Sequence, residues 1–78
     1  MASYRSQFLR GAIEEVRRAR RLLVEAEHLH ALKGTIAHLP QRYYQAQGFE
    51  NEARIGARRA IEHARELRAL ARREKGSR

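Results

Sequence analysis

One proline divides a chain in which apolar residues otherwise recur every three or four positions. Pro40 is the only proline among the 78 residues. A proline disfavours helix at the residue before it but is well accepted at the first position of a new helix. On both sides of Pro40 the apolar spacing is that of an amphipathic α-helix. The sequence therefore predicts an all-α protein built from two long helices.

Each predicted helix carries one apolar stripe. In the first helix, expected over residues 3–38, it comprises Phe8, Ala12, Val16, Ala19, Leu23, Ala26 and His30. In the second helix, expected over residues 41–74, small residues dominate and Phe49 and Leu67 are the bulky members: Ala46, Phe49, Ala53, Gly56, Ala60, Ala64, Leu67 and Ala71. This stripe passes Gly48 without a change of phase, which favours one continuous helix over a break at Gly48 and a restart at Asn51.

A turn at residues 38–41 would fold the two helices into an antiparallel hairpin. In that arrangement residue i faces approximately the residue that completes 79 with it. The whole chain, residues 1–78, then forms a single helical-hairpin domain with a frayed basic tail at residues 75–78. We expect this hairpin to be the unit on which any function is built.

A chain of this size has a marginal core of its own. A domain of about 60 residues buries only about 60% of the surface that its unfolded chain exposes. The sequence contains no cysteine, which excludes disulfides and zinc-finger patterns as supports. We therefore expect the hairpin to complete a four-helix bundle, either by dimerising or by packing on a larger protein.

The second half of the first helix is the candidate partner-binding surface. From Leu22 onward, apolar residues cover most of the helix circumference, which is more than one neighbouring helix can bury. The candidate anchors are Leu22, Leu29, Leu32 and Ile36. On the second helix, Tyr44 and Ile55 fall on the polar side among charged residues, and they extend the candidate surface because aromatic side chains are enriched at interfaces.

Positive charge is the second notable property of the sequence. Lys and Arg number 17 against nine acidic residues, for a formal net charge of +8, and 15 of the 17 are arginine. Such a balance favours nucleic acid, an anionic membrane surface or an acidic protein surface as a partner. In the hairpin, arginines of both helices converge, and the candidate phosphate-binding residues are Arg17, Arg18, Arg21, Arg58 and Arg59.

A simpler interpretation of the charges is a solvated surface that pairs with itself. Arginine and glutamate stand four residues apart in Glu14 and Arg18, Arg21 and Glu25, Glu50 and Arg54, and Arg58 and Glu62. Each such pair on a helix surface stabilises by only a few tenths of a kcal/mol. Nine acids still cannot neutralise 17 bases, so both interpretations stay open.

Few residues could support catalysis or bind metal. The chain has no Asp or Cys, one Thr and three Ser, and two packed helices offer no cleft for a nucleophilic triad or a carboxylate pair. No two histidines have the i, i+4 spacing of a helical metal site. We therefore expect neither an enzyme nor a protein with a cofactor, a metal or a small-molecule substrate.

Location is only weakly constrained by the sequence. No apolar run approaches the roughly 20 residues of a membrane span, and we expect a soluble cytoplasmic protein. The acid-free segment from Met1 to Ile13 is also similar to the start of a mitochondrial presequence, which makes a mitochondrial location a minor alternative.

A short segment of the second helix is similar to the second helix of the small two-helix protein of the large ribosomal subunit, itself a basic helical hairpin. The residues that carry this resemblance are Asn51, Ala53, Arg54, Ile55, Arg58, Arg59 and Ile61. Residues 1–40 have no counterpart, so no family is assigned. The sequence favours a non-catalytic accessory, regulatory or assembly module that docks through apolar helix surface, with a phosphate-contacting nucleic-acid-binding protein as the alternative.

Overall fold

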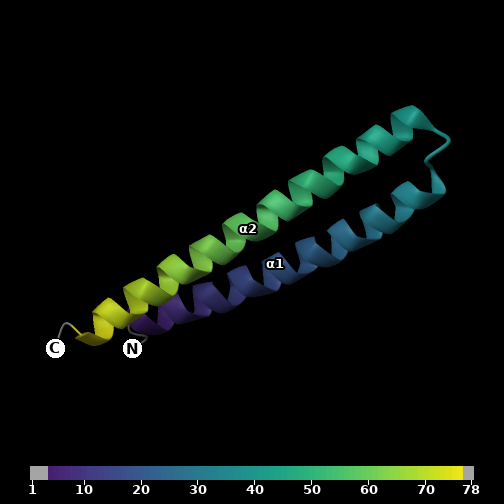
Figure 1. Ribbon diagram of the computed structural model, residues 1–78. Helices are drawn as coiled ribbons and strands as arrows, with labels where there is room; N and C mark the ends of the chain where they lie inside the picture. Colours follow the sequence, from purple (N-terminus) through teal and green to yellow (C-terminus); the bar gives the residue numbers. More distant parts are fainter. Residues whose placement is uncertain (1–3, 77–78) are drawn as a thin grey trace.

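Two long helices lie side by side in an antiparallel hairpin. The computed structural model describes residues 4–76, and the side chains of residues 4–74. Helix α1 spans Tyr4–Thr35 and helix α2 spans Pro40–Gly76, so the described part of the chain is all-helical apart from the turn. Both described ends lie at one end of a rod of 61 × 16 × 13 Å (Figure 1). The predicted all-α hairpin is confirmed.

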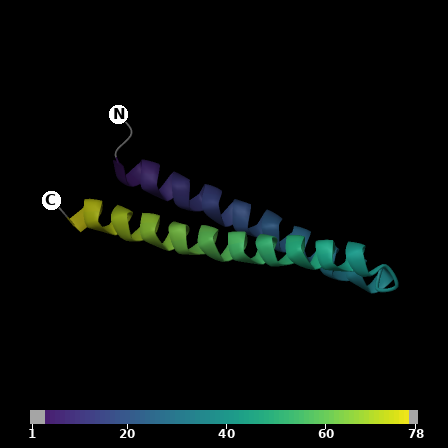
Figure 2. The same ribbon diagram turned by 90° about the horizontal axis from the view of Figure 1, so that it is seen from above.

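The two helices cross at a shallow angle. In Figure 2 they overlap near the turn and draw apart toward the termini, whereas Figure 1 shows them closest near the termini. Helix α2 runs through Gly48 without a break, as the phase of its stripe predicts. Residue 3, at the expected start of the first helix, and residues 77–78 of the expected frayed tail lie outside the described residues.

The turn lies at residues 36–39, earlier than the expected 38–41. Near the end of α1 the Thr35 hydroxyl donates to the Leu32 carbonyl at 2.8 Å, an alternative to continuing the helix. The Leu39 carbonyl accepts the Tyr43 amide at 2.9 Å. Pro40 therefore begins α2 directly, at the position where its missing N–H costs nothing. The chain reverses direction within the four residues 36–39.

Alanine forms the core. Among the described residues, every buried apolar side chain is an alanine, and these are Ala12, Ala19, Ala26, Ala46, Ala53, Ala57, Ala60, Ala64 and Ala71. Most recur every seven residues along a helix, the repeat of helices that wind around each other. No large side chain of residues 4–74 is fully buried. Small side chains let the two backbones approach closely, so larger residues are displaced to the edges of the interface.

Three members of the predicted stripes are exposed, and four others, Phe8, Val16, Gly56 and Leu67, are half-buried. Phe49, expected as a bulky plug, is 57% exposed, and Leu23 is 39% exposed. His30, expected at the core edge, is also exposed. The reason is the close alanine contact, which leaves no room between the helices for a ring or a leucine directly on the axis of the interface.

The register agrees with the expected rule that facing residues sum to about 79. Ala19 packs with Ala57 and Ala60 at the centre. A Cβ atom placed on Gly11 would lie 3.1 Å from Leu67, and one on Gly56 would lie 3.1 Å from Leu22, so these glycines mark close approach of the helices. Over the described residues neither helix contains the long apolar stretch needed to cross a membrane.

Candidate interaction surfaces

A buried carboxylate lies at the turn-proximal end of the interface. Glu50 of α2 is only 6% exposed and is the single buried charged residue in the described part of the chain. Its Oε1 lies 2.8 Å from Nζ of Lys33 on α1, and its Oε2 lies 2.9 Å from a guanidinium nitrogen of Arg54. His30 Nδ1 lies 3.5 Å from the same Oε2. The Lys33 ammonium also faces the Tyr43 ring, 5.6 Å from its centroid.

Two cations hold Glu50 in its charged form. The hydrogen bond from Lys33 is the largest effect and that from Arg54 the next, and together they lower the pKa of Glu50 from 4.5 to about 2. Burial acts in the opposite direction and is outweighed. Glu50 is therefore a structural ion-pair residue that joins α1 to α2.

The sequence interpretation placed Glu50 and Arg54 in an exposed surface pair, and this was wrong for Glu50. The signal that the prediction missed is a spacing of seven residues, which marks interface positions. Lys33 continues the series Ala12, Ala19 and Ala26, and Glu50 precedes Ala57, Ala64 and Ala71 by multiples of seven. Both charges therefore occupy interface positions, where opposite charges are paired to avoid an isolated buried ion.

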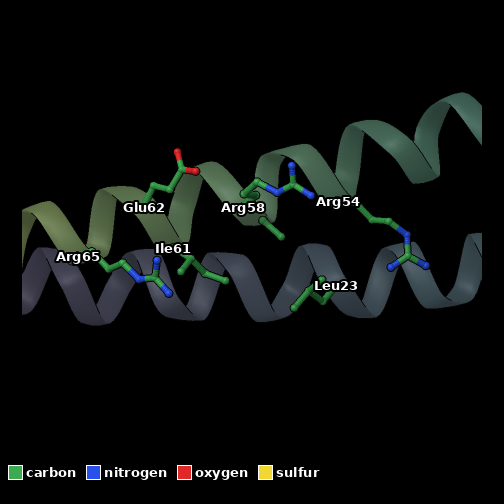
Figure 3. Close-up of a pocket in the computed structure, with 7 residues that line it drawn as sticks. Leu23, Arg54, Arg58, Ile61, Glu62 and Arg65 are labelled. Atoms are coloured by element: carbon green, nitrogen blue, oxygen red, sulfur yellow. The ribbon is translucent and has the colours of Figure 1, made fainter.

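One side of the hairpin, which we call the arginine face, carries two shallow hollows. The larger, of about 510 Å³, is shown in Figure 3 and is lined by Leu23, Arg54, Ala57, Arg58, Ile61, Glu62 and Arg65. Arg54 and Arg65 extend from α2 toward α1 on either side of Leu23 and Ile61, whereas Arg58 and Glu62 point away from α1 (Figure 3). The smaller, of about 310 Å³, is lined by Arg5, Leu9, Arg68, Ala71 and Arg72.

The opposite side, which we call the glutamate face, has different chemistry. Leu22 and Leu23 flank the alanine stripe of α1 on its two sides, which places them on opposite faces of the hairpin. A hollow of about 170 Å³ beside Leu22 is lined by Leu22, Glu25, Phe49, Glu52 and Ala53. On the same face Glu15 lies 3.3 Å from His63 of α2. No arginine lines this hollow.

The five arginines predicted to bind phosphate do not form one cluster. All five are exposed, but only Arg58 lines the larger hollow. Arg17 lies on the outer side of α1 and bonds Glu14 at 3.2 Å, and helical spacing places Arg21 beside it. Arg18 stands seven residues before Glu25 and Arg59 seven residues after Glu52, so helical spacing places both on the glutamate face. The prediction missed Arg5, Arg65, Arg68 and Arg72 as residues of one face.

The expected ion pairs at a spacing of four are mostly absent. Of the four, the structure contains Glu50 with Arg54, and Glu14 pairs with Arg17 rather than Arg18. Arg21 with Glu25 and Arg58 with Glu62 do not pair within 4 Å.

The predicted apolar anchors divide into two groups. Leu22, Leu29 and Ile36 are half-buried within the hairpin, and Leu22 packs on the alanine core. Three others are exposed: Leu32 by 46%, Tyr44 by 70% and Ile55 by 48%. Phe49 and Val24 are exposed to a similar degree and were not among the predicted anchors.

Histidines lie near glutamates in two places, His30 with Glu50 and His63 with Glu15. In residues 4–74 no three histidine or glutamate side chains are grouped closely enough to hold a metal ion. A comparison of this chain with known protein families, curated protein sequences and solved structures finds no match.

Proposed function

We propose that this protein is a non-catalytic helical interaction module that associates through the apolar side chains its own hairpin leaves exposed. The observation that carries the proposal is the contrast between its small core and its large exposed residues. Over residues 4–74 the buried apolar side chains are alanines, while ten large apolar side chains are at least 37% exposed, among them Phe49, Tyr44 and Leu32. An isolated hairpin thus leaves unused the hydrophobic stabilisation that burying these side chains would supply.

Surface area supports the same conclusion. The chain exposes 6405 Å², whereas a compact monomer of its mass exposes about 4,900 Å². The excess is about twice the roughly 800 Å² that one partner contributes to a protein–protein interface of ordinary size. Its radius of gyration of 17.6 Å likewise exceeds the roughly 11.5 Å of a compact domain of this length.

Sedimentation equilibrium of the purified chain, from about 1 μM to about 100 μM, tests the proposal. We expect a mass above the 9.1 kDa of one chain that increases with concentration. Leu32→Glu and Phe49→Glu should each shift the protein toward monomer, because a charge would replace exposed apolar surface. Gln41→Glu adds the same charge at an exposed position and should leave the mass unchanged. A well-folded monomer throughout this range would contradict the proposal.

A second candidate, binding of nucleic acid, is favoured by the arginine face. Six arginines and one glutamate line its two hollows. Lys and Arg that neutralise phosphates release counterions, so such binding weakens steeply with salt. Titration of a structured RNA and a duplex DNA at about 50 mM and about 200 mM salt tests this candidate. If binding were lost at the higher salt, the binding at low salt would reflect only the general attraction between a polyanion and a basic protein, and this candidate would be rejected.

A further inference from the structure

Four exposed charged residues of the glutamate face are left without an ion pair. They are Arg18 and Glu25 on α1 and Glu52 and Arg59 on α2. In the described part of the chain, none of the four is in an ion pair within 4 Å. Glu15 and His63, on the same face, do pair with each other, 3.3 Å apart. The face therefore carries four charges that the hairpin itself does not match.

These four charges form a simple pattern along the rod. Glu25 and Glu52 line the same hollow, so the two glutamates lie at one level. Arg18 and Arg59 each stand seven residues, about 10 Å, from the glutamate of their own helix. Because the helices are antiparallel, both arginines lie toward the termini. The face thus has two negative charges on the turn side and two positive charges on the terminal side, with Leu22 between them.

Such a pattern is complementary to itself. When two identical faces meet with their rods antiparallel, each helix lies against the same helix of the other copy. Arg18 of one copy then faces Glu25 of the other, and Arg59 faces Glu52, about a two-fold axis. Opposite charges across an interface favour association and fix its orientation. A parallel pair would place arginine opposite arginine and glutamate opposite glutamate, so the charges select the antiparallel arrangement.

The position of this axis gives separate support. The point midway between Arg18 and Glu25 falls immediately before Leu22. The stretch from Tyr4, the first residue of α1, to Leu39, the last residue of the turn, has its midpoint at the same place. Two copies that pair about this axis therefore overlap along their whole length, and each covers the glutamate face of the other from end to end.

The same face carries apolar surface that a second copy would cover. Leu22 is half-buried, and one of its methyl groups would lie 3.1 Å from a Cβ on Gly56. Phe49 is 57% exposed and lines the hollow of the two glutamates. In the antiparallel pair, Leu22 meets its own counterpart beside the axis. An apolar centre bordered by charges is the usual arrangement of a protein interface.

The arginine face does not offer the same contact. Six arginines and one glutamate line its two hollows. Any symmetric pairing of this face would therefore place arginines opposite arginines, and like charges opposite each other disfavour association.

We propose that the partner of this module is a second copy of the same chain, paired through the glutamate face about a two-fold axis beside Leu22. This inference rests on the proposed function and adds the partner, the surface and the orientation. Both copies use the same face, so the contact is complete at two chains. The product is an antiparallel four-helix bundle with a turn at each end and an arginine face on each outer side.

Two charge-reversal variants test the pairing. Arg18→Glu with Arg59→Glu makes all four positions acidic, and Glu25→Arg with Glu52→Arg makes all four basic. In sedimentation equilibrium the wild type should reach the mass of two 9.1 kDa chains. Each variant alone should associate more weakly by a factor of about ten or more. An equimolar mixture of the two should form dimers again, because every facing pair is then opposite in charge. Circular dichroism verifies that each variant remains helical.

A fourfold variant that combines both changes tests the orientation and keeps the net charge of +8. Its arginines and glutamates have exchanged places, so two copies of it should dimerise as the wild type does. It should not form mixed dimers with the wild type, because those would pair like charges. Native mass spectrometry with isotope-labelled wild type measures the mixed species. A parallel pair would favour mixed dimers, and their predominance would overturn the proposal.

A matched control changes the net charge on the other face. Arg20→Glu with Arg58→Glu makes the same change in charge as the first variant, with one substitution on each helix. Arg58 lines the larger hollow of the arginine face together with Leu23, and Arg20 stands three residues before Leu23. Both arginines are exposed. The control should dimerise as the wild type does, and a loss as large as that of the first variant would overturn the proposal.

The remaining outcomes separate this inference from the proposed function. If both reversal variants dimerised as the wild type does, or if the wild type formed assemblies larger than two chains, the two-fold pairing would be wrong while association through apolar surface would stand. If the wild type were monomeric, both would fail. In that case, loss of salt-resistant RNA binding in the Arg20 and Arg58 variant would assign the arginine face to nucleic acid.

Discussion

The two ends of the helix interface are stabilised by different chemistry. Toward the termini, α1 and α2 meet through Ala12, Ala64, Ala71 and the close approach of Gly11 to Leu67. Toward the turn, the buried carboxylate of Glu50 joins the helices through Lys33 and Arg54. Alanines repeated every seven residues set the distance between the helices. They do not fix the register, because a shift of one helix by seven residues would again bring alanine against alanine. The ion pair occurs once, and we infer that it specifies the register.

The largest effect is expected when the charged end of the interface loses one partner. Glu50→Leu leaves Lys33, whose side chain is only 14% exposed, without its carboxylate, and an unpaired buried charge is strongly destabilising. Urea unfolding at fixed protein concentration should show a greater loss than for any other substitution considered below. Replacing both residues, Lys33→Leu with Glu50→Leu, should recover most of the loss. Equal stability of the single variant and the wild type would contradict the assigned role.

At the alanine interface the expected cost comes from bulk instead of charge. Ala19→Leu should lower the free energy of unfolding by about 1–3 kcal/mol. The added carbons must fit into the space between α1 and the α2 residues Ala57 and Ala60. Ala31→Leu, at an exposed position of the same helix, is the matched control and should change it little. If Ala19→Leu stabilised the protein, the close contact between the helices would be in doubt.

Two glycines of α2 provide a finer comparison of interface with surface. Nothing lies within 4 Å of a Cβ placed on Gly48, so Gly48→Ala should stabilise by about 0.5–1 kcal/mol through helix propensity alone. Gly56→Ala should gain less, because its Cβ would lie 3.1 Å from a methyl group of Leu22. Chemical unfolding of both variants measures the difference. Equal gains would mean that Leu22 does not restrict this site.

The smallest effect is expected from the exposed ion pair. Glu14 and Arg17 lie 3.2 Å apart with side chains that are 60% and 64% exposed. Exposed pairs contribute about 0–1 kcal/mol, screened by salt. Glu14→Gln should therefore hardly change the free energy of unfolding, whereas Glu50→Gln, the same chemical change in the buried pair, should lower it clearly.

The pH dependence should distinguish the same two residues. Because the pKa of Glu50 falls from 4.5 to about 2 on folding, the stability it contributes is present above pH 4.5 and is lost as the pH falls toward 2. The stability difference between wild type and Glu50→Gln should therefore shrink over that range. A difference that stayed constant down to pH 2 would contradict the lowered pKa of Glu50.

Much of the fold could be predicted from the sequence, because helix period and a single proline are local signals. The continuous second helix and the register followed from the stripe and from Pro40. The exposure of Phe49 and the burial of Glu50 could not be obtained in that way, because both depend on how closely the helices approach. That distance is a property of the alanines on both helices together.

The candidate surfaces were predictable only in part. Exposure of Leu32, Tyr44 and Ile55 agrees with the helical wheel of a single helix. The division into an arginine face and a glutamate face requires both helices in their correct register, since Leu23 of α1 and Ile61 of α2 share one hollow. A count of charges along the sequence gives one net value of +8 and does not show which charges line which hollow.

Thermal unfolding of the wild type at increasing protein concentration, followed by circular dichroism, tests most directly whether this hairpin depends on association. If the exposed apolar side chains are buried by a second copy, the midpoint temperature should rise steadily between about 1 μM and about 100 μM, because association stabilises the folded state by mass action. A midpoint that did not change over this range would mean that one hairpin is stable by itself, and would contradict the account.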